Sequence, residues 1–300
     1  MDKKLIPFNN FYKIFNFISI SLIILSLLLL IFKGLNYGVD FKGGTLIELR
    51  TSDSNITISE LRRSFSKMNL GDVSVKEFGK ENDYIVKFEK KIIIEENFIQ
   101  NLKVELIKQI GNSFDFRRVE SVGPKVSSEL LKSGIIAIGL ALAAMLIYIW
   151  IRFEWQFSLG AIVALFHDVI ITLGIFSLLN LEINLSIIAA VLTIVGYSMN
   201  DTVVIFDRVR ENLKKFSDIK IFELTNISIN ETLSRTLITS ITTLLALLSI
   251  FFFGGEVLKG FSFAMILGVL IGTYSSIFIA NPILVSLGVS QKTIIKEDKN

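Results

Sequence analysis

Six long apolar runs are the feature that most constrains how this chain can fold. A helix that crosses a membrane must satisfy its own backbone hydrogen bonds over about 30 Å of hydrocarbon, which takes roughly 20 mostly apolar residues. The runs that meet this requirement are residues 14–32, 133–151, 157–179, 185–206, 236–253 and 261–287. The sequence therefore predicts an α-helical polytopic membrane protein with six transmembrane helices.

The composition agrees with a bilayer as the solvent and excludes several kinds of site. Hydrophobic residues make up 51% of the chain, and the mean hydropathy of +0.60 exceeds what a water-soluble surface tolerates. The basic residues do not gather on an aromatic-studded surface, so we expect no nucleic-acid partner. With no cysteine and a single histidine, neither a disulfide nor a zinc site is expected, and we predict no metal and no cofactor.

Lysine and arginine residues in the short loops indicate the orientation of the chain, because cytoplasmic loops carry an excess of them. With the N-terminus inside and the long segment 33–132 left out of the count, the termini and short loops carry thirteen basic residues on the cytoplasmic side and only Lys259 on the outer side. The thirteen are Lys3, Lys4, Lys13, Arg152, Arg208, Arg210, Lys214, Lys215, Lys220, Arg235, Lys292, Lys296 and Lys299. We therefore expect cytoplasmic segments at 1–13, 207–235 and 288–300, and an outer domain at 33–132.

The first apolar run has an alternative interpretation as a cleaved signal peptide, because it follows Lys3, Lys4 and Lys13. No small-residue cleavage site follows Phe32, however. A retained first span is therefore the favoured interpretation.

The outer segment alternates between the hydrophobic periods of strands and helices. Strands are predicted at 45–50, 72–78, 84–89 and 114–122, and helices at 59–68 and 94–110, with Thr57 or Ser59 as a helix cap. The order βαββαβ predicts a ferredoxin-like α+β domain. No catalytic constellation occurs in it, so we expect no enzyme activity and interpret its charged residues as a solvated surface.

Ionisable and polar residues inside the apolar runs are the candidate functional residues, because a charge at mid-bilayer costs several kcal/mol. They are His167 and Asp168 in the third run, Asn200, Asp201 and Thr202 in the fourth, and Arg235 at the start of the fifth. The fourth run leads inward and the fifth returns, so Asp201 and Arg235 are expected within reach of each other. Protonation of the acid would then be coupled to helix position.

Other interpretations of these residues stay open. The long side chain of Arg235 could instead extend to the membrane interface, and His167 could be a structural hydrogen-bond donor between helices. The charged residues at 207–211 are interpreted as a solvated helix end. Small residues at Gly268 and Gly272, and at Gly160 and Ala164, predict close contacts between helices.

A set of short motifs carries a resemblance to a known family. These are GVDFKGGT at 38–45, VGP at 122–124, RFE at 152–154, a His-Asp pair within 165–169, GYSMNDTVV at 196–204, DRVREN at 207–212, RTLITS at 235–240 and GTYSS at 272–276. Together they resemble the SecF family, the membrane subunits of the bacterial SecDF protein-export complex, which are related to the RND transporters. The likeness extends from residue 34 to about residue 285.

The resemblance implies that such a subunit, together with SecD, uses the proton gradient to promote late steps of protein export across the inner membrane. It places Asp201 and Arg235 at the positions of the family's proton-pathway carboxylate and arginine. Asn200, Thr202, His167 and Asp168 lie within matching motifs. The implied partners are SecD, which would supply the other half of an RND-type bundle, the SecYEG channel, YajC, unfolded secretory polypeptides and the lipid bilayer.

Two other functions are compatible with the sequence alone. One is half of an RND-type exporter of small molecules or lipids, although such exporters usually carry both halves in one chain. The other is a non-transporting scaffold that only stabilises the Sec channel.

Overall fold

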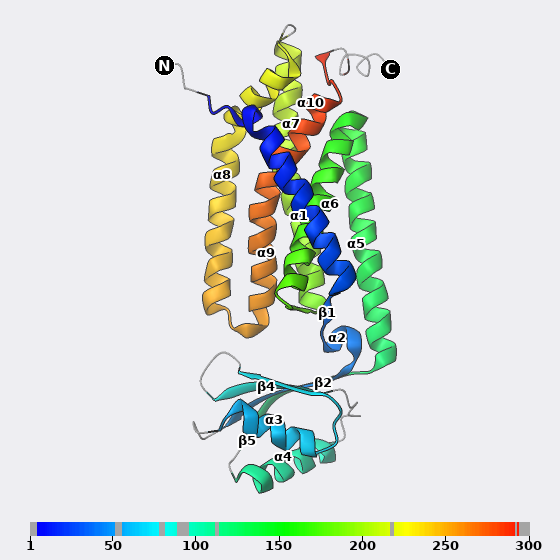
Figure 1. The fold of residues 1–300 in the computed structure, drawn as a ribbon, viewed down its shortest axis with the longest axis vertical. Helices are drawn as coiled ribbons and strands as arrows, with labels where there is room; N and C mark the ends of the chain where they lie inside the picture. The colour runs from blue at the N-terminus through cyan, green and yellow to red at the C-terminus, as the bar shows by residue number, and fades with distance from the viewer. Residues whose placement is uncertain are drawn as a thin grey trace. The chain divides into compact units, whose positions relative to one another are not determined.

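A computed structural model of the chain describes residues 5–51, 56–77, 82–88, 96–111, 114–216, 219–291 and 293. The chain divides into two compact units (Figure 1). The membrane unit comprises Met1–Asn36, Ala137–Leu181 and Ser186–Asn300, and the sheet unit comprises Tyr37–Ile136 and Glu182–Leu185. The sheet unit covers most of the segment 33–132 for which an outer domain is predicted, but it also includes a short segment from much later in the chain.

Within the described part of the chain, six helical segments are long and apolar enough to cross a membrane, which confirms the predicted number of spans. They are α1 (Tyr12–Phe32), α5 (Pro124–Arg152), α6 (Trp155–Leu178), α7 (Leu185–Lys215), α8 (Ile221–Phe253), and α9 (Glu256–Ser275) with its continuation through η2 (Ser276–Ala280) and α10 (Asn281–Ser286). A short 3₁₀ turn, η1 (Phe8–Phe11), precedes α1.

The region 207–235, expected as a cytoplasmic loop, is mostly helical. Helix α7 continues to Lys215 and α8 begins at Ile221, so both helices extend well past their apolar runs. Arg208 accounts for part of this extension, because it bonds Glu211 one turn further along α7 and Glu231 on α8, each at 2.7 Å. Paired charges at these spacings support a helix after its apolar stretch has ended.

Helices α6, α7 and α9 form the centre of the membrane unit. About half or more of the apolar stretch of each is buried within this chain, whereas α1, α5 and α8 are mostly exposed. Glycine allows the close approach of α9 to α7, since a Cβ at Gly268 would lie 2.2 Å from Ile194 and one at Gly272 would lie 2.9 Å from Ser198. The close contact predicted from these two glycines is confirmed.

The last span is not a regular α-helix. The segment η2 is a π-helix, and Pro282 follows it in the first turn of α10. Proline has no backbone N–H, so it leaves a carbonyl of the preceding turn without its usual helical donor. The side chain of Asn281 also bonds the π-helical segment, with its Nδ2 2.7 Å from the carbonyl oxygen of Ser276.

The sheet unit contains the predicted order of strands and helices. The elements are β2 (Gly44–Thr51), α3 (Ile58–Lys67), β3 (Val73–Glu77), β4 (Asp83–Phe88), α4 (Glu96–Ile110) and β5 (Phe114–Val122). The strands pair antiparallel in the order β3-β4-β2-β5. The ferredoxin-like assignment stays an interpretation of this order. Three short elements were not expected, namely β1 (Asn36–Tyr37), α2 (Val39–Lys42) and β6 (Glu182–Ile183), which pairs with β1.

Helices α3 and α4 cover one face of this sheet (Figure 1). Side chains alternate along β2, so that Ile47 and Leu49 are buried beneath the helices while Glu48 between them is only half-buried. Phe65 of α3 and Leu106 of α4 are fully buried against that face. Packing of this apolar layer accounts for the independent core of the sheet unit.

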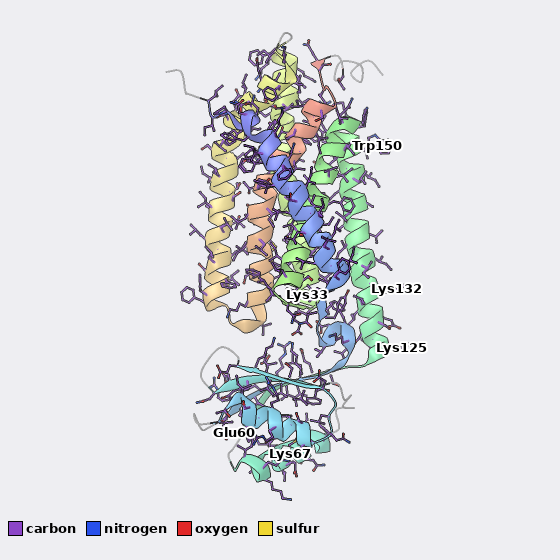
Figure 2. The ribbon with its side chains drawn as sticks, viewed as in Figure 1. Lys33, Glu60, Lys67, Lys125, Lys132 and Trp150 are labelled. Atoms are coloured by element: carbon purple, nitrogen blue, oxygen red, sulfur yellow. The ribbon has the colours of Figure 1, made fainter. Side chains whose placement is uncertain are left out.

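Helix α3 begins at a capping box. The Thr57 hydroxyl accepts a hydrogen bond from the Glu60 backbone N–H at 3.3 Å, and the Glu60 carboxylate accepts one from the Thr57 backbone N–H at 3.0 Å. This identifies Thr57 rather than Ser59 as the cap. Figure 2 shows Glu60 and Lys67 towards opposite ends of α3, an arrangement that complements the helix dipole.

Candidate functional site

Asp201 of α7 lies at a meeting point of three helices. Its side chain is almost completely buried. Its Oδ2 accepts hydrogen bonds from Ser240 of α8 at 3.5 Å and from Thr273 of α9 at 3.3 Å, and the two hydroxyls lie 2.8 Å apart. A carboxylate inside an apolar bundle is costly unless its oxygens are bonded, and among the described residues the groups that bond Asp201 are hydroxyls.

Asp168 of α6 forms a second buried acidic cluster. It is completely buried, and its Oδ2 accepts hydrogen bonds from Ser198 of α7 at 2.5 Å and Ser275 of α9 at 2.9 Å. Its Oδ1 lies 2.8 Å from Nδ1 of His167. Asp168 therefore ties α6 to the same two helices, α7 and α9, that border the Asp201 cluster.

His167 is buried beside this acid and has one ring nitrogen to spare. Its Nε2 is buried and has no hydrogen-bond partner among the described residues, while its ring stacks on Tyr274 with centroids 5.9 Å apart. The contact with Asp168 fits the interpretation of His167 as a structural donor.

Four consecutive hydroxyl residues of α9 and η2 connect the two clusters. Successive residues of a helix point about 100° apart, so neighbouring side chains reach different helices. Thr273 bonds Asp201, Tyr274 bonds Ser19 of α1 at 2.7 Å, Ser275 bonds Asp168, and Ser276 bonds Thr202 at 2.8 Å. A change in the position or protonation of either acid therefore alters hydrogen bonds made by the same turn of the last span.

The expected pairing of Asp201 with Arg235 does not occur in this conformation. Arg235 is exposed on α8 and makes no ion pair within the part of the chain that the structure describes. It precedes Ser240 by five residues, about 7.5 Å along the helix axis, so its long side chain starts about one and a half turns from the acid.

The remaining predicted residues differ in how they relate to the acids. Thr202 is buried and belongs to the hydroxyl network. Asn200 lies on an exposed face of α7, away from the two clusters. The charges after residue 206 are paired at the helix end, for example Asp207 with Arg152 at 2.8 Å, as their interpretation as a solvated helix end requires.

Sequence reasoning missed four hydroxyl residues that bind the acids, namely Ser198, Ser240, Thr273 and Ser275. All four lie within motifs that carry the family resemblance, but nothing in their residue type marked them as ligands of a carboxylate. No group of three or more acidic or histidine side chains is placed to hold a metal ion in the described ranges.

Comparison with known families matches most of the chain. The family model for the protein export membrane protein SecD/SecF, C-terminal, matches residues 103–290, and the model for the SecD/SecF GG motif matches residues 28–54. The chain is 46% identical over 282 residues to the protein translocase subunit SecF of Rickettsia conorii, covering 92% of this chain and 90% of the relative. It is 43% identical over 291 residues to the SecF subunit of Cereibacter sphaeroides, covering 94% and 89%.

Solved structures give the same result. The crystal structure of SecDF, a translocon-associated membrane protein from Thermus thermophilus, matches with a TM-score of 0.85 and 35% identity, over 95% of this chain and 39% of that one. A second SecDF crystal structure, in the super-membrane-facing form, matches with a TM-score of 0.71 and 33% identity, over 100% and 40%. This chain thus spans about two fifths of the SecDF chains. It belongs to the SecF family of protein translocase subunits, multi-pass proteins of the inner membrane with a role in protein export.

Proposed function

We propose that this chain forms one half of a proton-driven export machine, in which SecD supplies the other half and Asp201 is the group that gains and loses the proton. The burial of Asp201 among hydroxyl groups of α8 and α9 is the observation that carries this proposal. The match to only about two fifths of the SecDF chains supports a partner of at least comparable size.

Hydroxyl ligands suit an acid that changes its protonation state. A carboxylate only accepts hydrogen bonds, whereas a carboxylic acid also donates one, and a Ser or Thr hydroxyl can rotate to serve either state. When Asp201 loses its proton, the negative charge favours the approach of Arg235 along α8. When it gains a proton, that attraction ends, so α7 and α8 are held differently in the two states.

The mostly exposed helices α1, α5 and α8 give the membrane unit surfaces suited to a partner half and to lipid. Apolar side chains such as Leu245 and Phe252 of α8 and Leu140 of α5 are 60%, 69% and 65% exposed. Trp150 of α5 also points outward, as Figure 2 shows. We infer that SecD covers part of this surface and lipid the rest, and that SecYEG, YajC and an emerging unfolded polypeptide join the working complex.

The distribution of basic residues supports an orientation with both termini in the cytoplasm and the sheet unit in the periplasm. In this orientation the sheet unit meets the polypeptide after it has left the channel. Gradient-driven movement of that unit would then promote the late stage of export.

The test is an Asp201→Asn variant, assembled with SecD in inverted membrane vesicles. We expect gradient-stimulated export to fall by about tenfold or more, as removal of an acid–base group commonly does. Glu211→Gln, which removes an exposed acid further along the same helix, is the matched control and should keep the stimulation. Full stimulation by Asp201→Asn would refute the proposal.

A further inference from the structure

We propose that the short connection Glu182–Leu185, between α6 and α7, is a coupling segment through which the sheet unit positions the helix that carries Asp201. The inference rests on the proposed function and names Lys87 and Asp40 as its positioning residues. Glu182–Leu185 belongs to the sheet unit by its contacts, although most of α6 and α7 on either side belongs to the membrane unit.

Three contacts within the sheet unit hold this coupling segment. The Lys87 ammonium of β4 pairs with the Glu182 carboxylate. The Gly38 backbone N–H donates to the Ile183 carbonyl at 2.8 Å. The Leu185 backbone N–H donates to Oδ2 of Asp40 at 3.0 Å.

The contact at Leu185 is a helix cap supplied by a distant part of the chain. Leu185 is the first residue of α7, whose first N–H groups have no partner within the helix. The Asp40 carboxylate satisfies one of them and is favoured there by the helix dipole. Asp40 therefore fixes where α7 begins.

Gly38 leaves the space that Glu182 occupies. A Cβ at residue 38 would lie 2.4 Å from Oε1 of Glu182, and the other Glu182 side-chain atoms would also crowd it. Any larger residue would push this carboxylate from its place beside Lys87. The pattern GVDFKGG thus gains a physical explanation at two positions: the glycine admits Glu182, and the aspartate caps α7.

The coupling segment is directly continuous with the proposed proton site. Helix α7 is unbroken from Leu185 to Lys215, and Asp201 lies sixteen residues after its start, about 24 Å along the axis. A helix transmits an axial shift or rotation along its length, so a displacement of the capped end reaches Asp201. On the other side of the segment, α6 carries Asp168.

Charge reversal tests this coupling in the full chain assembled with SecD. Lys87→Glu and Glu182→Lys should each lower gradient-stimulated export by about fivefold, because each places like charges in contact. The double change should restore export to within about twofold of the original. Equal loss in the single and double variants, or no loss in either single variant, would overturn the inference.

The matched control is another ion pair of the same sheet that does not touch the coupling segment. Arg118 of β5 pairs with Glu120, and both side chains are about two fifths exposed. Arg118→Glu and Glu120→Arg should leave gradient-stimulated export unchanged. A purely structural role for Lys87 predicts a lower melting temperature and less export with or without the gradient, whereas a positioning role lowers the gradient-stimulated part alone.

A crosslink gives an independent test, because the chain has no cysteine of its own. If the segment moves together with the sheet unit, crosslinking the cysteines of a Lys87→Cys, Glu182→Cys double variant with a short bismaleimide should preserve gradient-stimulated export. If the crosslink abolishes gradient-stimulated export while the reagent leaves each single-cysteine variant unaffected, the inference is overturned. The two proposals can fail separately. If Asp201→Asn abolishes gradient stimulation but the charge reversals have no effect, only the role of the coupling segment is refuted. If Asp201→Asn keeps full stimulation, the proposed function is refuted.

Discussion

The sheet unit and the apolar core of the membrane unit differ in how they bond their acidic side chains. In the sheet unit, acids pair with cations, as the buried Asp83 does with Arg50 and the exposed Glu120 does with Arg118. In the membrane unit, the buried Asp201 and Asp168 are bonded mainly by hydroxyl groups. An ion pair favours one protonation state, whereas a hydroxyl accommodates both. The comparison distinguishes acids whose ion pairs favour the charged form from acids whose hydroxyl partners accommodate both protonation states.

The largest expected effect tests whether surface pairs stabilise the sheet unit at all. Phe65→Ala removes a fully buried ring from its core and should lower the local free energy of unfolding by about 3–5 kcal/mol. Arg118→Ala, which breaks exposed ion pairs, should lower it by about 1 kcal/mol or less. Hydrogen exchange of the β2 and β4 amides in the full chain measures both, and similar losses would break the comparison.

The next largest effect concerns Asp168, the completely buried acid. Asp168→Asn keeps the size of the side chain but can no longer exchange a proton, so we expect gradient-stimulated export to fall by about tenfold. The control is Asp115→Asn, an exposed acid of β5, which should have no effect. If Asp168→Asn exports normally with the gradient, this cluster is structural and Asp201 acts alone.

A smaller effect is expected from single hydroxyl ligands. Thr273→Val keeps the shape of the side chain and removes one hydrogen bond to Asp201, so gradient-stimulated export should fall by about threefold to tenfold. Thr273→Ser retains the hydroxyl and should retain most of the stimulation. Equal behaviour of the two variants would show that the hydroxyl does not serve the acid.

The smallest expected effect concerns Glu60, an acid of the sheet unit that stays ionised at neutral pH. Hydrogen bonds from Thr57 hold the pKa of the Glu60 carboxylate below its ordinary value, so the folded capping box favours the ionised acid. Its contribution is present above the ordinary pKa of glutamate and is lost as the pH falls through the lowered folded value. The first α3 amides should therefore be less protected from hydrogen exchange at acidic pH than near neutral pH. In the Glu60→Gln variant this change in protection with pH should vanish.

The sequence predicted most of the fold because its signals are local. Apolar runs of bilayer length identified six spans, and alternating periods identified the order of elements in the sheet unit. Glu182–Leu185 was missed because Glu182 is held by Lys87, 95 residues away in the chain, a contact that no local pattern encodes. The extension of α7 beyond residue 211 and the early start of α8 at Ile221 were missed because their charged and polar residues resemble those of a loop.

The candidate site was predicted in its acids but not in its ligands. Asp168 and Asp201 stood out because a charge in an apolar run is costly. Hydroxyl residues are common in membrane helices and often bond their own backbone, as Thr242 does to the Ile238 carbonyl, so Ser240 and Thr273 gave no comparable signal. The pairing of Arg235 depends on a side-chain conformation, which its position in the sequence does not fix.

The wide turn at Ser276–Ala280 sets the rotational phase of the last membrane helix. A π-turn contains one residue more than an α-turn, so the side chains before it and after it are offset by an angle that a regular helix would not give. Deleting one residue there would rotate Thr273 and its neighbours by about 100° relative to the packed end at Asn281. The bulge thus acts as an angular spacer that keeps the hydroxyls aimed at both acids while Ala280 packs beneath Gly160.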